Sequence, residues 1–247
     1  MARPPERTPK SPDEELLGAE QPTIASTTSD SERLERVQKE LKTGFGALAR
    51  IRPAVSVFGS ARVPVGDPQY ELTRELARRL GEEGLAVITG GGPGLMEAAN
   101  RGAQDADVAS VGLRIELPFE QGMNQWVDIP LHFHYFFTRK VMFVRYASAF
   151  VILPGGFGTL DELFEAVTLI QTKRVREFPV VLVGTDYWSG LISWMRDHLL
   201  AEGKIDEDDL DLFVVSDDPD EVVARVVAAV LAQGLAPGER ASPGIEP

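Results

Sequence analysis

The sequence contains no cysteine, and this absence excludes several kinds of chemistry. Without cysteine there is no disulfide, no thiolate nucleophile and no zinc–thiolate site, which fits a cytosolic protein. Histidine is also scarce, with three residues in the whole chain. His132 and His134 alternate in "LHFH", but a metal site needs further ligands that the neighbouring sequence does not supply. We therefore predict no metal.

Positive charge and long apolar runs are lacking as well. The chain has 25 Lys and Arg against 38 Asp and Glu, a net charge of −13. Nucleic acids and anionic membranes attract basic faces, so this balance argues against both as partners. No apolar run reaches the roughly 18 residues of a membrane helix, and the opening "MARPPERTPKSPDEE" lacks the apolar region of a signal peptide. We expect a soluble, cytoplasmic protein.

The common nucleotide-binding motifs are absent too. In "GGGPGL", Leu95 stands where the third glycine of G-x-G-x-x-G belongs, and in "GGFGTLD" that position is Asp161. The chain's single Gly-Lys pair, at Gly203 and Lys204, precedes Ile205 and so makes no P-loop. A G-x-S-x-G nucleophile elbow is also missing. Dinucleotide cofactors, P-loop ATP chemistry and a serine nucleophile are therefore disfavoured.

What the sequence does contain is a regular alternation of apolar runs and amphipathic segments. Continuous Val/Ile/Leu runs followed by helices are typical of a doubly wound, mostly parallel sheet with helices on both faces. The sequence thus predicts one Rossmann-like α/β domain. The expected strands are 54–61, 85–91, 109–115, 149–155, 178–184 and 212–217, and the expected helices after them are 70–84, 94–106, 135–147, 160–174, 188–203 and 219–233.

Both ends of the chain have the composition of disordered segments. Residues 1–30 are rich in Pro, Ser, Thr and Glu, and residues 234–247 are similar, so we predict a catalytic domain over 31–233. A helix should begin near Ser29 or Ser31, either of which can cap it. Because such tails bury little apolar surface, removing residues 1–28 should leave stability and activity nearly unchanged.

Three of the predicted strands end in glycine-rich turns: "FGSAR" (58–62), "TGGGPGLM" (89–96) and "LPGGFGT" (153–159). Backbone N–H groups at a helix start, together with the helix dipole, bind anions. The carboxyl ends of parallel strands meet at one edge of the sheet, where ligands bind. We predict that these turns hold a phosphate group of the substrate.

Two features of this region have alternative interpretations. Thr159 and Glu162 have the spacing of a capping box, which needs no ligand. Alternatively, a phosphate at residues 155–159 takes the same backbone donors and leaves Glu162 free to face a sugar carbon. Arg139, in "YFFTRKVMFV", is either a snorkelling side chain at the edge of a buried helix or a bidentate ligand of a sugar phosphate.

"PGGFGTLDE", with "RK" upstream, resembles the P-G-G-x-G-T-x-x-E signature of the Lonely Guy phosphoribohydrolases, which are often mislabelled lysine decarboxylases. The step of fifteen residues from Arg139 to Pro154 agrees with that family, and the resemblance covers about residues 50–230. It implies hydrolysis of a nucleoside 5′-monophosphate, of the AMP or cytokinin riboside type, to free base and ribose 5-phosphate. It also implies no cofactor and a homodimer or higher homo-oligomer. A non-catalytic nucleotide sensor or carrier, or a phosphosugar or nucleotide transferase, is the alternative.

The resemblance also assigns roles to residues. Arg139 and Glu162 would be the catalytic pair. Two departures concern the base pocket: only Pro93 separates "GGG" from "GLM", where cytokinin-activating members usually have two residues, and Phe143 replaces a common methionine. The residues implied to bind substrate are Lys140, Gly155, Gly156, Phe157, Gly158, Thr159 and Thr168, with Ser60 and Gly92 in the neighbouring turns.

Overall fold

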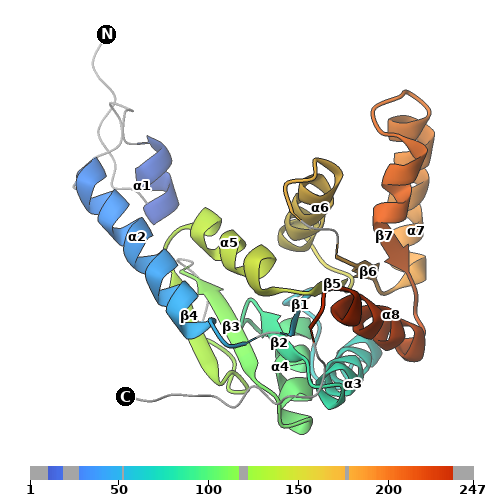
Figure 1. Cartoon of the computed structure of the whole chain (residues 1–247), viewed down its shortest axis with the longest axis horizontal. Helices are drawn as coiled ribbons and strands as arrows, with labels where there is room; N and C mark the ends of the chain where they lie inside the picture. Colours follow the sequence, from blue (N-terminus) through green and yellow to red (C-terminus); the bar gives the residue numbers. More distant parts are fainter. Residues whose placement is uncertain (1–10, 19–27, 52, 117–121, 176–177, 236–247) are drawn as a thin grey trace.

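The apolar runs of the sequence form the strands of one sheet. The computed structural model describes residues 11–18, 28–51, 53–116, 122–175 and 178–235. Within them lies a seven-stranded sheet in the order β4-β3-β2-β1-β5-β6-β7, parallel throughout (Figure 1). The predicted doubly wound α/β fold is confirmed. The strands are β1 (Ala54–Phe58), β2 (Ala86–Thr89), β3 (Ser110–Ile115), β4 (Ile129–Phe133), β5 (Ala149–Ile152), β6 (Val180–Leu182) and β7 (Phe213–Val215).

The centre of the sheet fixes where a ligand can bind. Strands β1, β2 and β5 are buried along their whole length, which explains their uninterrupted apolar sequences. Strand β1 lies between β2 and β5, so the strand order reverses at β1. In doubly wound sheets the ligand crevice opens outside the carboxyl ends of the strands at such a reversal. Here those ends carry the predicted glycine turns.

Helices cover both faces of the sheet (Figure 1). One apolar cluster joins the sheet to α2, α5, α6 and α7, and a second joins it to α3, α4 and α8. No helix among the described residues is long and apolar enough to cross a membrane. The helices are α1 (Pro12–Gly18), α2 (Asp30–Ala47), α3 (Pro68–Glu82), α4 (Leu95–Asp105), α5 (Phe136–Tyr146), α6 (Phe157–Gln171), α7 (Thr185–Trp194), continued by a π-helical turn (Met195–Leu200), a short 3-10 helix (Glu207–Leu212) and α8 (Pro219–Ala232).

Strand β4 was not predicted, because its sequence lacks a continuous apolar run. Leu131 and Phe133 are buried, whereas Pro130 and His132 are exposed. This alternation is that of a strand at the edge of a sheet, where proline is tolerated because one side of the backbone has no partner. β4 pairs with β3, with Leu131 opposite Leu113.

The N-terminal region also differs from its prediction. Residues 12–18 form the helix α1, although residues 1–30 were expected to be disordered. Asp13 accepts a hydrogen bond from the Phe136 N–H at 3.3 Å, and Glu15 lies 3.5 Å from the buried Arg33. These contacts with the domain, which composition does not reveal, order the helix. Residues 1–10 and 19–27 of this predicted tail, and 236–247 of the other, lie outside the described ranges. The predicted Ser29 cap of α2 is confirmed.

Candidate active site

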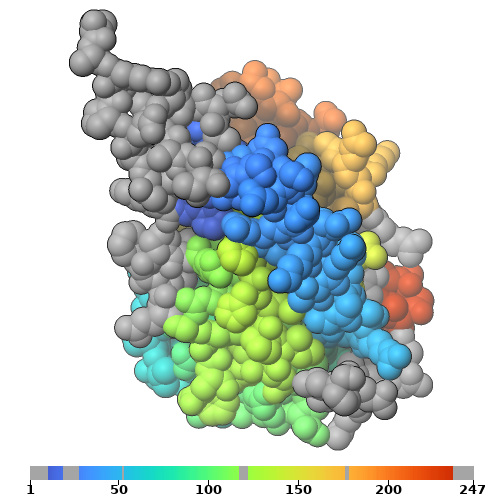
Figure 2. All heavy atoms as spheres, turned by 90° about the vertical axis from the view of Figure 1, so that its left-hand side faces the viewer, coloured from blue at the N-terminus to red at the C-terminus, as the bar shows by residue number. Residues whose placement is uncertain are grey.

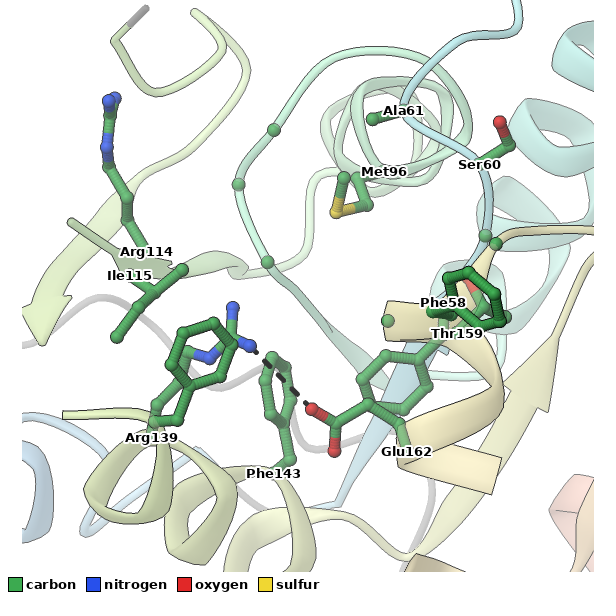
Figure 3. A pocket seen from close by; sticks show the side chains of 18 of the residues that line it. Phe58, Ser60, Ala61, Met96, Arg114, Ile115, Arg139, Phe143, Thr159 and Glu162 are labelled. Carbon is green, nitrogen blue, oxygen red and sulfur yellow. Dashed lines mark ion pairs between the residues drawn. The ribbon is translucent and has the colours of Figure 1, made fainter. Parts of the chain in front are cut away.

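A cavity of about 700 Å³ opens at the carboxyl edge of the sheet, beside the strand-order reversal. All three predicted glycine turns contribute to its wall, and helices α5 and α6 face each other across it (Figure 3). The lining residues come from the turn after β1 (Phe58 to Arg62), the turn after β2 (Gly90 to Gly92, with Met96), the end of β3 (Arg114, Ile115), α5 (Phe136, Arg139, Phe143) and the start of α6 (Gly156 to Thr159, Glu162), together with Gly122.

Backbone hydrogen bonds join the three turns. The Ser60 N–H donates to the Pro154 carbonyl, and the Leu95 N–H donates to the Ser60 carbonyl, both at 2.9 Å. Gly94 makes the second approach possible, because it has φ +69° and a Cβ there would lie 2.4 Å from the Ser60 oxygen. No other residue fits that position without moving the backbone. The turn after β1 is thus fixed between the other two.

The first turn of α6 has the geometry of an anion site. The helix begins at Phe157 with Gly156 as N-cap, and glycine has no side chain to cap the first N–H groups. A Cβ at Gly156 or Gly158 would meet nothing within 4 Å, which leaves space for a ligand against the backbone. Gly155 has a different role: a Cβ there would lie 2.1 Å from Thr159 Oγ1. Gly155 therefore permits close packing, while Gly156 and Gly158 border open space.

Glu162 is not part of a capping box. Because α6 begins at Phe157, Thr159 lies in the first turn and not at the N-cap, and Glu162 lies in the second turn. The Glu162 residue is 3% exposed, and its Oε2 has no hydrogen-bond partner among the described residues. Burial raises the pKa of Glu162 to about 7, although the nearby Arg139 acts in the opposite direction. The cavity wall thus holds a proton-exchanging group that titrates near neutral pH.

Arg139 faces Glu162 from the opposite wall. Its Nη2 lies 3.8 Å from Glu162 Oε1, and its guanidinium lies over the rings of Phe136 and Phe143, at 5.0 and 5.5 Å from their centroids (Figure 3). The side chain is 13% exposed and points into the cavity, so it does not snorkel to solvent. Stacking on two rings holds the planar cation in one orientation.

Comparison with known proteins agrees with this geometry. The family model described as "Possible lysine decarboxylase" matches residues 96–226. The chain is 30% identical over 163 residues to the rice (Oryza sativa subsp. japonica) protein named "Probable cytokinin riboside 5'-monophosphate phosphoribohydrolase LOG4", covering 63% of this chain and 68% of that protein. This chain belongs to the Lonely Guy family.

Two further proteins extend the comparison. A Rhodococcoides fascians protein named "Cytokinin riboside 5'-monophosphate phosphoribohydrolase" is 28% identical over 193 residues, covering 74% of this chain and 94% of its own length. Among solved structures, the molybdenum cofactor carrier protein of Chlamydomonas reinhardtii superposes with a TM-score of 0.52 at 22% identity, covering 73% of this chain and 99% of the carrier. The carrier shares the fold.

Three residues that the Lonely Guy resemblance implies to bind substrate are not among the described residues that line the cavity: Lys140, Thr168 and Gly155, the last of which packs against Thr159. Lys140 is not among the described residues that line the cavity; its ammonium pairs with Asp161 at 2.9 Å and Glu165 at 3.0 Å, which ties α5 to α6. Thr168 lies in a shallow hollow on the outer side of α6, beside Phe164. Thr168 follows Glu162 by six residues, a rotation of about 240° around the helix axis beyond one full turn. The two side chains therefore cannot share a face of α6. By contrast, Ser60, Gly92, Phe157 and Thr159 do line the cavity, as expected.

The sequence reading missed several lining residues. Arg114 precedes the last residue of β3, and a charge at the carboxyl end of an apolar strand is a signal that would have identified it. Phe136 and Ile115 carry no such signal, since both belong to ordinary apolar runs.

A buried polar network behind the "GGG" turn was also missed. Asn100 Oδ1 accepts from Thr89 Oγ1 at 2.6 Å and from Asn124 Nδ2 at 2.9 Å. Thr89 Oγ1 in turn accepts from the Gly91 N–H, and Asn124 donates to the Gly92 carbonyl at 3.0 Å. These bonds hold the backbone of the turn at Gly91 and Gly92. A satisfied network of this kind rigidifies the backbone it contacts.

Proposed function

We propose that this protein hydrolyses the N-glycosidic bond of a nucleoside 5′-monophosphate, of the AMP or cytokinin riboside type. The reaction gives the free base and ribose 5-phosphate. Water adds its hydroxyl to C1′ of the ribose, the bond from C1′ to the base nitrogen breaks, and the proton of the water passes to the base. The relatives named cytokinin riboside 5′-monophosphate phosphoribohydrolases support this reaction.

One observation carries the proposal: Glu162 is a buried carboxyl group whose Oε2 has no hydrogen-bond partner among the described residues, at a cavity wall next to the glycine-capped start of α6. A protein that only binds phosphate gains nothing from an acid in that position. A hydrolase does, because cleavage of an N-glycosidic bond develops positive charge on the ribose, which a nearby carboxylate stabilises. A base whose pKa lies near 7 is also matched to deprotonating water at neutral pH.

The other lining residues have consistent roles in this proposal. The N–H groups at Phe157 and Gly158 and the dipole of α6 would bind the 5′-phosphate. Arg139 would contact the sugar or phosphate and fix the substrate relative to Glu162. The binding energy would then serve to align the reacting groups. The base would lie against the apolar part of the wall, where Met96 and Phe143 are found. Phe143, one of the two departures from the family pattern, lies in this part of the wall.

The direct test is incubation with AMP and with adenosine, followed by chromatography for adenine. AMP should be cleaved and adenosine scarcely at all, because the phosphate supplies the orientation. The matched variant is Glu162→Gln, which keeps the shape and removes the base. Equal turnover of AMP and adenosine would show that the glycine turns serve another purpose.

A non-catalytic nucleotide-binding carrier is the second candidate, and the fold alone is compatible with it, as the molybdenum cofactor carrier shares this fold. The same incubation separates the two. A panel of purine and N6-substituted purine monophosphates that bind in calorimetry, yet release no base over hours, would favour the carrier. Release of base that depends on Glu162 would exclude it.

A further inference from the structure

The helix that carries Arg139 begins without the groups that normally stabilise a helix start. Its N-cap is Tyr135, whose side chain makes no cap hydrogen bond among the described residues, and its first turn contains no acid. Instead, Arg139, the last residue of the first turn, adds a cation near the positive end of the helix dipole, where cations are unfavourable. The start of α5 therefore needs negative charge from another part of the chain.

Glu40, from the middle of α2, supplies such a charge. Its Oε1 accepts from the His134 N–H at 3.0 Å and lies 2.8 Å from His134 Nδ1, and its Oε2 accepts from Thr138 Oγ1 at 2.6 Å. The residue is 7% exposed. A buried carboxylate is costly unless it is hydrogen-bonded, and here the residue before the N-cap and a first-turn side chain of α5 provide those bonds.

Asp13, from α1, supplies the second charge. Its Oδ1 accepts from the N–H of Phe136, the first residue of α5. Phe136 is also a ring on which the Arg139 guanidinium lies. Two carboxylates from two N-terminal helices thus accept hydrogen bonds from His134, Phe136 and Thr138 around the start of one helix, beside the cavity wall.

The rest of α2 follows α5 closely. A Cβ at Gly44 would lie 2.6 Å from Met142 Sδ, so glycine allows the two helices to approach, and Tyr146 Oη donates to the Phe45 carbonyl at 3.3 Å. Figure 2 shows α2 lying across the same face of the molecule as the yellow-green β4–α5 segment. The contact therefore extends from the start of α5 to its end.

We propose that Glu40 and Asp13 are positioning residues for Arg139, acting through the start of α5. They touch no reacting atom; they fix the helix from which the guanidinium and its supporting ring project. Both lie outside residues 96–226, which match the family model. The inference rests on the proposed function for the role of Arg139. The claim that the two carboxylates fix the start of α5 does not depend on that function. It also reverses the expectation that residues 1–28 are dispensable.

The test uses the full chain and three single variants that each remove one charge: Glu40→Gln, Asp13→Asn and, as the matched control, Glu35→Gln, an exposed position on α2. Hydrogen exchange of the amides at residues 134–139 should accelerate in the first two and stay at the wild-type rate in the control. Affinity for ribose 5-phosphate, measured by calorimetry, should fall about tenfold in Glu40→Gln and less in Asp13→Asn, as expected for a displaced binding group.

A double-mutant cycle separates positioning from general loosening. In an Arg139→Ala background, Glu40→Gln should change ribose 5-phosphate affinity by less than about twofold, because the group it positions is gone. A full, additive loss in that background would overturn the proposal, as would wild-type exchange and affinity in both carboxylate variants. If the Glu40→Gln variant does not fold, the same measurements on Asp13→Asn test the proposal. Wild-type protein that cleaves no nucleotide would refute the proposed function, yet the exchange data would still test the role of the two carboxylates.

Discussion

Glu162 Oε1 lies 3.8 Å from Arg139 Nη2, and the two side chains reach one cavity from two different helices, α6 and α5. The charges attract each other at this distance, but it is too long for a direct hydrogen bond. Both side chains are nearly excluded from water, at 4% and 13% exposure. The pair is therefore close enough to be coupled and far enough apart to admit ligand atoms beside it.

Glu162→Gln should lower turnover and raise stability at the same time. Burial raises the pKa of Glu162 from the usual 4.5 to about 7, so the folded protein holds this proton more tightly than the unfolded chain. Below pH 4.5 both states are protonated and the group costs nothing; as the pH rises through 4.5 to 7, stability is lost. At pH 8 the cost is at most about 3 kcal/mol.

The measurement for this variant is a melting temperature at pH 8 and at pH 4, with kcat for AMP. We expect turnover to fall ~10²–10⁴-fold, with a melting temperature several degrees above wild type at pH 8 and close to it at pH 4. Near wild-type turnover in Glu162→Gln would show that Glu162 has only a structural role.

The pH dependence of kcat/KM should report the same group. If Glu162 acts as a carboxylate, activity is full above its pKa and is lost as the pH falls through about 7, because one bound proton inactivates the base. The measurement is kcat/KM for AMP between pH 5 and 9, corrected for the phosphate titration of AMP by using substrate analogues of known phosphate pKa. A profile that stays flat down to pH 5 would contradict the role of Glu162 as the base.

Gly158→Ala should separate stability from binding. Gly158 is helical and its Cβ would meet open space, so alanine should stabilise α6 by up to ~1 kcal/mol. The same methyl group would occupy the space proposed for phosphate and raise KM for AMP. The control is Gly190→Ala in α7, which also meets open space but lies outside the cavity lining. It should raise the melting temperature with KM unchanged. If KM for AMP is similar in the two variants, the phosphate does not bind at this turn.

A homodimer is expected from the family, and the surface offers a face for it. Phe157 is 92% exposed and Phe164 38% exposed on α6, while Phe137 is 45% exposed on α5. Phe157 and Phe164 border one hollow, and contiguous exposed apolar groups are typical of interaction surfaces. Light scattering at micromolar concentration should give twice the chain mass of 27.0 kDa or a higher multiple, and Phe164→Glu should lower it. A wild-type mass of 27.0 kDa would exclude the dimer.

The sequence predicted the parts of the fold that depend on local pattern. The β1, β2 and β5 strands are continuous apolar runs, and the glycine turns follow them directly, so the position of the cavity could be inferred. Strand β4 could not, because its ordering depends on pairing with β3 at the edge of the sheet. Helix α1 is similar: its order comes from Asp13 and Glu15 contacts with distant residues, which a compositional argument does not contain.

The candidate site was predictable where a residue's direction follows from helix geometry. Glu162 and Thr159 share one face of α6, and both line the cavity. Lys140 was misplaced because consecutive helical residues point about 100° apart, so it cannot follow Arg139 into the cavity. Its actual partners, Asp161 and Glu165, belong to a helix whose packing angle no local pattern specifies.

The hydrogen bonds of Ser60 have a consequence for folding kinetics. This residue joins the turn after β5 to the turn after β2, so the cavity is complete only when two segments that are distant in sequence have both reached β1. Contacts of high sequence separation form late and slowly in parallel-sheet proteins. Ligand binding should therefore recover in the last phase of refolding, after the helical signal has returned. A stopped-flow experiment with a fluorescent AMP analogue would follow that delay, and the protein's own activity would then serve as a probe of complete assembly of the sheet.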